Sequence, residues 1–141
     1  MNAAPVERRF RAGSMADLAA LLDFIDMACD PAGADVGFAV RLAVEEVFTN
    51  VLEHGYGGDG PVAVCVTTDG SQVRVVLEDD APTFNPSQAP APDLASDAPD
   101  REPGGLGWHL VHQVMDDVQH KSRGERGNTY TLVKRLPAPA P

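Results

Sequence analysis

A carboxylate and a carboxamide stand four positions apart in an otherwise apolar run, residues 42–56, and they are the side chains of this sequence best suited to chemistry. An α-helix brings residues i and i+4 onto one face. The side-chain oxygen of Asn50 suits Mg²⁺, which takes few protein ligands and completes its shell with water and phosphate oxygens. The carboxylate one turn earlier, Glu46, could position or deprotonate an attacking nucleophile.

The same pair has a simpler interpretation. Glu46, Asn50 and Glu53 could form the solvated stripe of an amphipathic helix whose opposite face is core. For a lone pair on an ordinary helix this simpler interpretation is favoured. The motifs that follow along the chain reverse that preference.

Two later segments carry a similar ambiguity. Residues 78–84 read as a strand that ends in acids, and as a strand-end turn such acids are more often solvated than functional. Residues 104–107, Gly-Gly-Leu-Gly, precede an apolar helix and would leave free backbone N–H groups and the positive end of a helix dipole. That arrangement suits phosphate. Glycines also simply punctuate loop-to-helix junctions, so this motif alone is a weak signal.

The periodicity of apolar residues predicts three helices, over residues 14–29, 35–53 and 108–115. Ser14 is a suitable N-cap for the first and Asp35 for the second. The apolar positions assigned to the core-facing sides of these two helices are Leu18, Leu21, Leu22, Ile25 and Met27, followed by Val40, Val44, Val47 and Val51.

Alternating apolar residues predict five strands, over residues 6–12, 62–68, 73–78, 118–122 and 129–135. A turn signal between the second and third predicts a hairpin. The proline-rich stretch between the third strand and the third helix is expected to be a mobile lid or binding loop. This order of elements predicts an α+β fold, a two-layer sandwich with helices on one face of a mainly antiparallel sheet.

Composition limits the functional classes. The chain of 141 residues is long enough for one domain, and its net charge of −10 argues against binding to nucleic acid or to an anionic membrane. No apolar stretch approaches the about 20 residues that cross a bilayer, and no apolar signal core begins the chain. With Cys29 and Cys65 expected to be reduced thiols, a cytoplasmic protein is predicted.

The order and spacing of these motifs resemble one family, the ATP-binding domain with the Bergerat (GHKL) fold that is shared by histidine kinases, gyrases and MutL. The sequence looks closest to the anti-sigma-factor serine/threonine kinases of the RsbW and SpoIIAB type. The resemblance spans roughly residues 6–136. It implies a histidine kinase-like ATPase domain over residues 1–136, with a lid at 81–105 and a Pro/Ala tail at 137–141. ATP and Mg²⁺ are the cofactors it implies.

The resemblance also implies site roles. By its match to the family's N box, Glu46 is the general base or water-positioning residue and Asn50 holds Mg²⁺. His54, in the same box, either approaches the nucleotide or is an ordinary helix-end histidine. In the next box Asp79 receives the adenine amino group. The other residues expected to contact ATP are Ala81, Phe84, Gly104, Gly105, Leu106, Gly107 and Thr129, the last lying under the adenine.

One position departs from the family pattern. The second box normally has glycine two residues after the adenine-binding aspartate, and this chain has Ala81. Glycine permits a positive φ or a close backbone approach. A methyl group could therefore crowd the nucleotide or strain the turn, by about 1 kcal/mol if a left-handed conformation is required.

The function implied is that of an anti-sigma factor kinase. It would bind Mg·ATP, phosphorylate a serine of a STAS-domain anti-anti-sigma factor and, in another state, sequester a sigma factor, thereby regulating transcription. The resemblance also points to a homodimer formed partly through the first strand, and to a partner surface around residues 14–30 and the lid. The alternative is a non-catalytic switch module of the same fold that binds nucleotide and transfers no phosphate.

Overall fold

The structure, a computed structural model, describes residues 4–81 and 103–137. The helical elements are α1 (Met15–Cys29), the short 3-10 helix η1 (Asp30–Ala32), α2 (Ala34–Asn50), the π-helical turn η2 (Val51–Tyr56), α3 (Pro103–Val114) and a second 3-10 turn, η5 (Gly124–Arg126). The strands are β1 (Val6–Arg11), β2 (Pro61–Thr68), β3 (Gln72–Asp79), β4 (Asp117–Ser122) and β5 (Asn128–Arg135).

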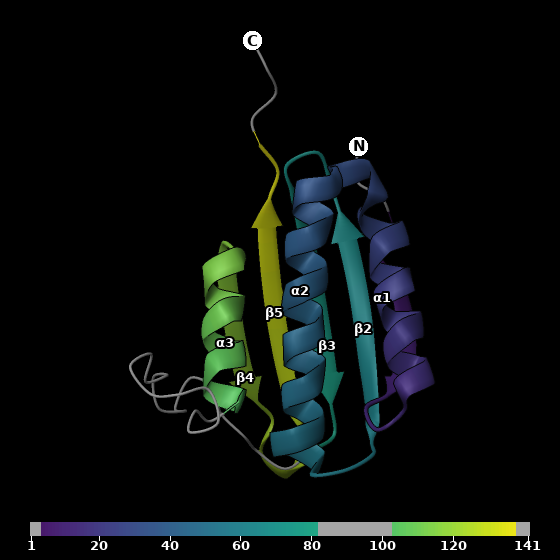
Figure 1. The fold of residues 1–141 in the computed structure, drawn as a ribbon, viewed down its shortest axis with the longest axis vertical. Coiled ribbons are helices and arrows are strands. Elements are labelled where there is room, and N and C mark those ends of the chain that lie inside the picture. Colours follow the sequence, from purple (N-terminus) through teal and green to yellow (C-terminus); the bar gives the residue numbers. More distant parts are fainter. Residues whose placement is uncertain (1–3, 82–102, 138–141) are drawn as a thin grey trace.

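The five strands form one antiparallel sheet in the order β1-β2-β3-β5-β4. The three helices lie side by side on one face of it, with α2 over the middle and α1 and α3 on either side (Figure 1). This is the two-layer α+β sandwich that the order of elements predicts, so the predicted fold class is confirmed.

The core lies between the helix layer and the inward-facing side chains of the strands. The predicted valine stripe is confirmed, because Val40, Val44 and Val47 of α2 and Val51 of the π-helical turn are all fully buried. Met27 differs, since 78% of it is exposed. Ile25 and Cys29 lie one turn apart on the buried side of α1, and the residue midway between them points the other way. In the part of the chain that the structure describes, no helix is long and apolar enough to cross a membrane.

The helix ends differ from the predicted ones at two places that bear on the site. Gly33, not Asp35, is the N-cap of α2, and the π-helical turn prolongs this helix to Tyr56. Helix α3 begins at Pro103, five residues before the predicted start. Proline suits the first turn of a helix, where its missing N–H leaves no bond unmade. The glycine motif at 104–107 therefore belongs to the first turns of α3 and not to the lid.

Candidate functional site

The segments that carry the motif residues meet at one end of the molecule. Helix α2 and strand β3 end there, and α3 and β5 begin there, at the lower end of the view in Figure 1. The sheet register places Asp79, the last residue of β3, directly opposite Asn128, the first residue of β5. Residues that are far apart in the sequence are thereby gathered into one candidate site.

The Asp79 carboxylate is the most deeply buried acid of the described segments, with 1% of the residue exposed. Its Oδ1 accepts hydrogen bonds from Asn128 Nδ2 at 2.9 Å and from the Ala81 backbone N–H at 3.0 Å. Its Oδ2 is buried and makes no hydrogen bond of normal geometry within the described residues, although the Tyr130 hydroxyl, which also lacks such a bond, interacts with this carboxylate. Burial raises the pKa of Asp79, while these two hydrogen bonds and the charge of Arg123 act in the opposite direction. A buried acceptor with a free oxygen is poised to receive a ligand N–H.

The turn that follows Asp79 is held from three sides. The guanidinium of Arg123 donates from Nη2 to the Asp79 carbonyl oxygen at 2.6 Å. The Tyr56 hydroxyl, at the end of the π-helical turn, accepts from the Asp80 N–H at 2.7 Å. Gly127 has a φ of 121° and lies so close to the Asp79 carbonyl that any side chain there would overlap it. The end of α2 and the β4–β5 turn therefore both fix the position of Asp79.

Ala81 is fully buried at the end of this turn. Every non-glycine residue that the structure describes has a negative φ, so Ala81 does not adopt the left-handed conformation that would strain it. Its methyl group packs toward Gly55, where an added Cβ would lie only 3.2 Å away. The alanine is therefore accommodated without backbone strain, because a glycine opposite it leaves room.

Glu46 and Asn50 lie on one face of α2, as predicted. Asn50 is 3% exposed, and its Nδ2 is buried with no partner in the described chain. Glu46 is half-buried, and its pKa is raised by burial first and then by the nearby charges of Glu45 and Glu53. Gly107 of α3 lies against its carboxylate, so that a side chain at Gly107 would overlap the Glu46 oxygen. A carboxylate with a raised pKa at a helix–helix contact suits a proton acceptor.

Comparison with known proteins places this site in a family. The chain matches the histidine kinase-like ATPase domain over residues 13–134. It belongs to that family. The anti-sigma F factor of Bacillus velezensis is 30% identical over 99 residues, which cover 69% of this chain and 68% of the relative. Those of Bacillus thuringiensis and Bacillus subtilis are 31% and 29% identical, with the same coverage. The predicted resemblance to the RsbW and SpoIIAB type is confirmed.

As a histidine kinase-like ATPase, the chain is expected to hold ATP at the end of the sheet where Asp79 lies. Thr129, predicted to lie under the adenine, is not brought there. It pairs with Glu78 in the register, and neighbouring residues of a strand point to opposite faces. The side chain beside Asp79 is Asn128, which is fully buried. If the first residue of β5 is paired with the last residue of β3, Asn128 and not Thr129 lies opposite Asp79. That pairing would have identified Asn128 from the sequence.

For the other residues predicted to contact ATP, the structure gives the position of the backbone only, or does not describe the residue. Phe84 lies outside the described residues, as does most of the predicted lid. His54 lies in the π-helical turn. Gly104, Gly105 and Leu106 occupy the first turn of α3, where backbone N–H groups lack partners within the helix and can face an anion.

The described residues contain no group of three or more His, Cys, Asp or Glu side chains that could hold a metal ion. The predicted Mg²⁺ of this ATPase site fits an arrangement with few protein ligands, in which Asn50 and nucleotide phosphates share the ion. Asn50 would offer its side-chain oxygen to the ion, and its buried Nδ2, which has no partner in the described chain, could donate to a phosphate oxygen. The two histidines of α3 contact neighbouring side chains of the same helix: His109 contacts Gln113, and His112 contacts Trp108.

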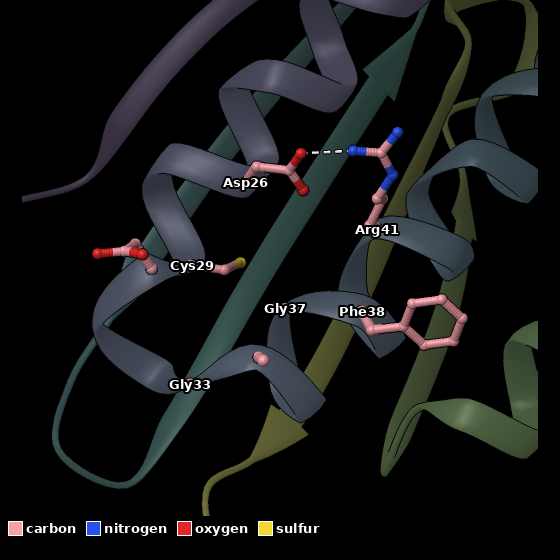
Figure 2. A pocket seen from close by; sticks show the side chains of 8 residues that line it. Asp26, Cys29, Gly33, Gly37, Phe38 and Arg41 are labelled. Carbon is pink, nitrogen blue, oxygen red and sulfur yellow. Dashed lines mark hydrogen bonds and ion pairs between the residues drawn. The ribbon is translucent and has the colours of Figure 1, made fainter.

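A separate hollow of about 300 Å³ lies at the opposite end of the helix layer. Figure 2 shows Asp26 of α1 joined to Arg41 of α2, with Cys29 between the helices and the Phe38 ring extending outward. Asp26 and Arg41 there neutralise each other as an ion pair. Burial raises the pKa of the Cys29 thiol to about 11, which leaves it protonated and unreactive. This hollow shares no residue with the candidate nucleotide site.

Proposed function

We propose that this protein is an anti-sigma factor kinase that binds Mg·ATP, phosphorylates a serine of a STAS-domain anti-anti-sigma factor and sequesters a sigma factor. The family membership supports the ATP-dependent part, and the names of the anti-sigma F relatives support the regulatory part. The observation that carries the proposal is the free, buried Oδ2 of Asp79, because it matches the amino group of adenine. Guanine has a carbonyl oxygen at that position.

The other site residues have roles that follow from their positions. Glu46 is the base that takes the proton of the serine hydroxyl as it attacks the γ-phosphate. Asn50 would hold Mg²⁺, which when bound neutralises charge on the phosphates. The first turn of α3 would face those phosphates, since Gly107 brings it against Glu46.

Incubation with labelled ATP, Mg²⁺ and the co-encoded STAS protein tests the proposal. Transfer of label to a serine of the STAS protein is the expected result. Nucleotide-dependent binding of the partner without transfer would instead favour the non-catalytic switch module. Absence of both ATP binding and partner binding would contradict the proposed function as a whole.

Replacing the proposed Mg²⁺ ligand should damage both binding and chemistry. We expect Asn50→Ala to lower ATP affinity and to reduce phosphoryl transfer by about 100-fold, because the phosphates lose a positioned cation. Titration of Mg²⁺ at fixed ATP measures the effect, and Thr49→Ala, at the half-buried neighbouring position, is the control. A variant that keeps the wild-type Mg²⁺ dependence would remove Asn50 from the metal site.

We further propose that partners dock around residues 14–30 and that two copies pair through β1. Met15 and Met27 on α1 are 80% and 78% exposed, so both offer apolar side chains that a partner could cover. Strand β1 is an edge of the sheet, and Val6 on it is also exposed. An edge strand has unpaired N–H and C=O groups that can pair with another chain.

Amide hydrogen exchange measured with and without the co-encoded STAS protein tests this surface. We expect protection in α1 on complex formation, strongest when ATP is present, and slow exchange in β1 of the free protein. The amide of Val66 in β2 is the internal reference. It lies on the side of β1 that is already paired within the monomer, so its exchange should not depend on a second copy. Protection confined to the sheet face opposite the helices would contradict the proposed surface.

A further inference from the structure

We propose that Asn128 and His120 are positioning residues that set the base specificity of the nucleotide site. Together they fix the orientation of the Asp79 carboxylate, so that its Oδ2 is the oxygen presented to the amino group of adenine. The inference rests on the proposed function, because it requires a nucleotide base at Asp79.

The contacts of Asn128 determine which way its amide faces. Its Nδ2 lies 2.9 Å from Asp79 Oδ1 and 3.4 Å from the Ala81 carbonyl oxygen. A carbonyl oxygen and an ionised carboxylate can only accept hydrogen bonds. The amide nitrogen must therefore face both of them, and the amide oxygen must face the opposite way, toward His120.

His120 prevents the amide from turning over. Its Nε2 lies 2.8 Å from Asn128 Oδ1, so this ring nitrogen must carry a proton and donate it. The ring stacks on Tyr130, its register partner on β5, with ring centroids 4.9 Å apart and planes 28° from parallel. The stacking holds the plane of the ring beside Asn128, and the hydrogen bond to Asn128 Oδ1 favours the ring orientation that points Nε2 at it.

The consequence falls on Asp79. Its Oδ1 is occupied by Asn128 and by the Ala81 N–H, whereas its Oδ2 makes no hydrogen bond of normal geometry within residues 4–81 and 103–137, where the Tyr130 hydroxyl is a nearby donor. The hydrogen bond from Asn128 also lowers the pKa of Asp79 against the effect of burial, which keeps the carboxylate an acceptor. An acceptor in this place favours a 6-amino purine and opposes a 6-oxo purine, whose carbonyl is itself an acceptor.

Calorimetric titration with ATP and with ITP, its 6-oxo analogue, tests the inference. His120→Phe keeps an aromatic ring for stacking on Tyr130 and removes the Nε2 donor. We expect its ATP affinity to fall about tenfold while its ITP affinity changes little, so that the selectivity ratio falls by about the same factor. His120→Gln, which retains a side-chain N–H, should restore part of the ratio. His109→Phe, an exposed histidine of α3, is the matched control and should leave the ratio unchanged.

A parallel loss of ATP and ITP affinity in His120→Phe would overturn the inference, because it would show a merely structural role. A long-range ¹H–¹⁵N NMR spectrum of the nucleotide-free protein gives a second test. We expect the His120 ring to carry a proton on Nε2, and a ring protonated on Nδ1 alone would overturn the inference even if ATP binds normally. A wild-type protein that binds neither nucleotide would overturn the proposed function and this inference together.

Discussion

Glu46→Gln is expected to reduce phosphoryl transfer by about 100- to 10,000-fold while leaving ATP affinity within a few-fold of the wild type. A general base acts mainly in the transition state, so its loss lowers the rate more than ground-state binding. Glutamine is nearly isosteric with glutamate, and it fits the space that Gly107 leaves beside this side chain. Single-turnover transfer and calorimetric ATP binding measure the two effects separately.

The same substitution should raise the melting temperature at neutral pH. Burial and the charges of Glu45 and Glu53 raise the pKa of Glu46, which means that folding disfavours its ionised form. At a pH well above the raised pKa of the folded state that cost is fully present, and glutamine removes it. The gain should shrink as the pH falls through the raised pKa of the folded state. It should vanish below about pH 4, where Glu46 is protonated in both states.

Glu45→Gln is the matched control, because it is the adjacent, half-buried carboxylate of the same helix. It should leave phosphoryl transfer close to the wild-type rate and stabilise the fold less. Two results would contradict the role of Glu46: transfer that persists in Glu46→Gln, or equal losses of ATP affinity in Glu46→Gln and Asn50→Ala.

The sequence predicted the three helices and five strands because the apolar pattern of each segment records which face it buries. The valines of α2 show this directly, since their spacing of three and four residues matches their complete burial. The predicted start of α3 is wrong because the glycines at 104–107 indicate a loop, and nothing next to them in the sequence shows that the helix begins at Pro103. The prediction that Met27 faces the core is wrong, because this residue continues the apolar run of the sequence but lies on the exposed side of the helix.

The contacts that build the site could not be predicted as readily, because they join distant segments. Arg123 reaches the Asp79 carbonyl across 44 positions of sequence, and Asn128 reaches the carboxylate across 49. The local motif predicts Asp79 as the residue that binds adenine. It also predicts Thr129, whereas the register places Asn128 beside Asp79, because a shift of one residue along a strand exchanges the two faces of the sheet.

Asn50 Nδ2 and Asp79 Oδ2 are among the buried polar atoms that make no hydrogen bond of normal geometry with the residues that the structure describes. Leaving such groups unpaired costs free energy, about 1–3 kcal/mol each from mutational data. A ligand that satisfies them binds the folded state only, and so it stabilises the protein in proportion to its concentration above the dissociation constant. Nucleotide binding should therefore be visible as a rise in melting temperature.

Asp79→Asn is expected to lower ATP affinity by about 100-fold and to move the preference of the site toward ITP. Two donors, Asn128 Nδ2 and the Ala81 N–H, converge on the place of Oδ1, so the oxygen of the new amide must stay there. Its nitrogen then takes the place of Oδ2 and points a donor at the adenine amino group, which is also a donor. The site loses a hydrogen bond to a charged acceptor and leaves two donors facing each other.

The 6-oxo purine meets the opposite situation in this variant, because its carbonyl can accept from the new amide nitrogen. Calorimetric titration of wild type and Asp79→Asn with ATP and ITP measures both changes in one series. Asp80→Asn is the control: its exposed carboxylate lies 4.0 Å from Arg123, and it should leave both affinities close to the wild-type values. If Asp79→Asn lowered ATP and ITP affinity equally, Asp79 would act on the fold of the turn and not on the base. If it left ATP affinity unchanged, the adenine would have to lie elsewhere, because no rotation of the amide can offer two acceptors where the carboxylate has them.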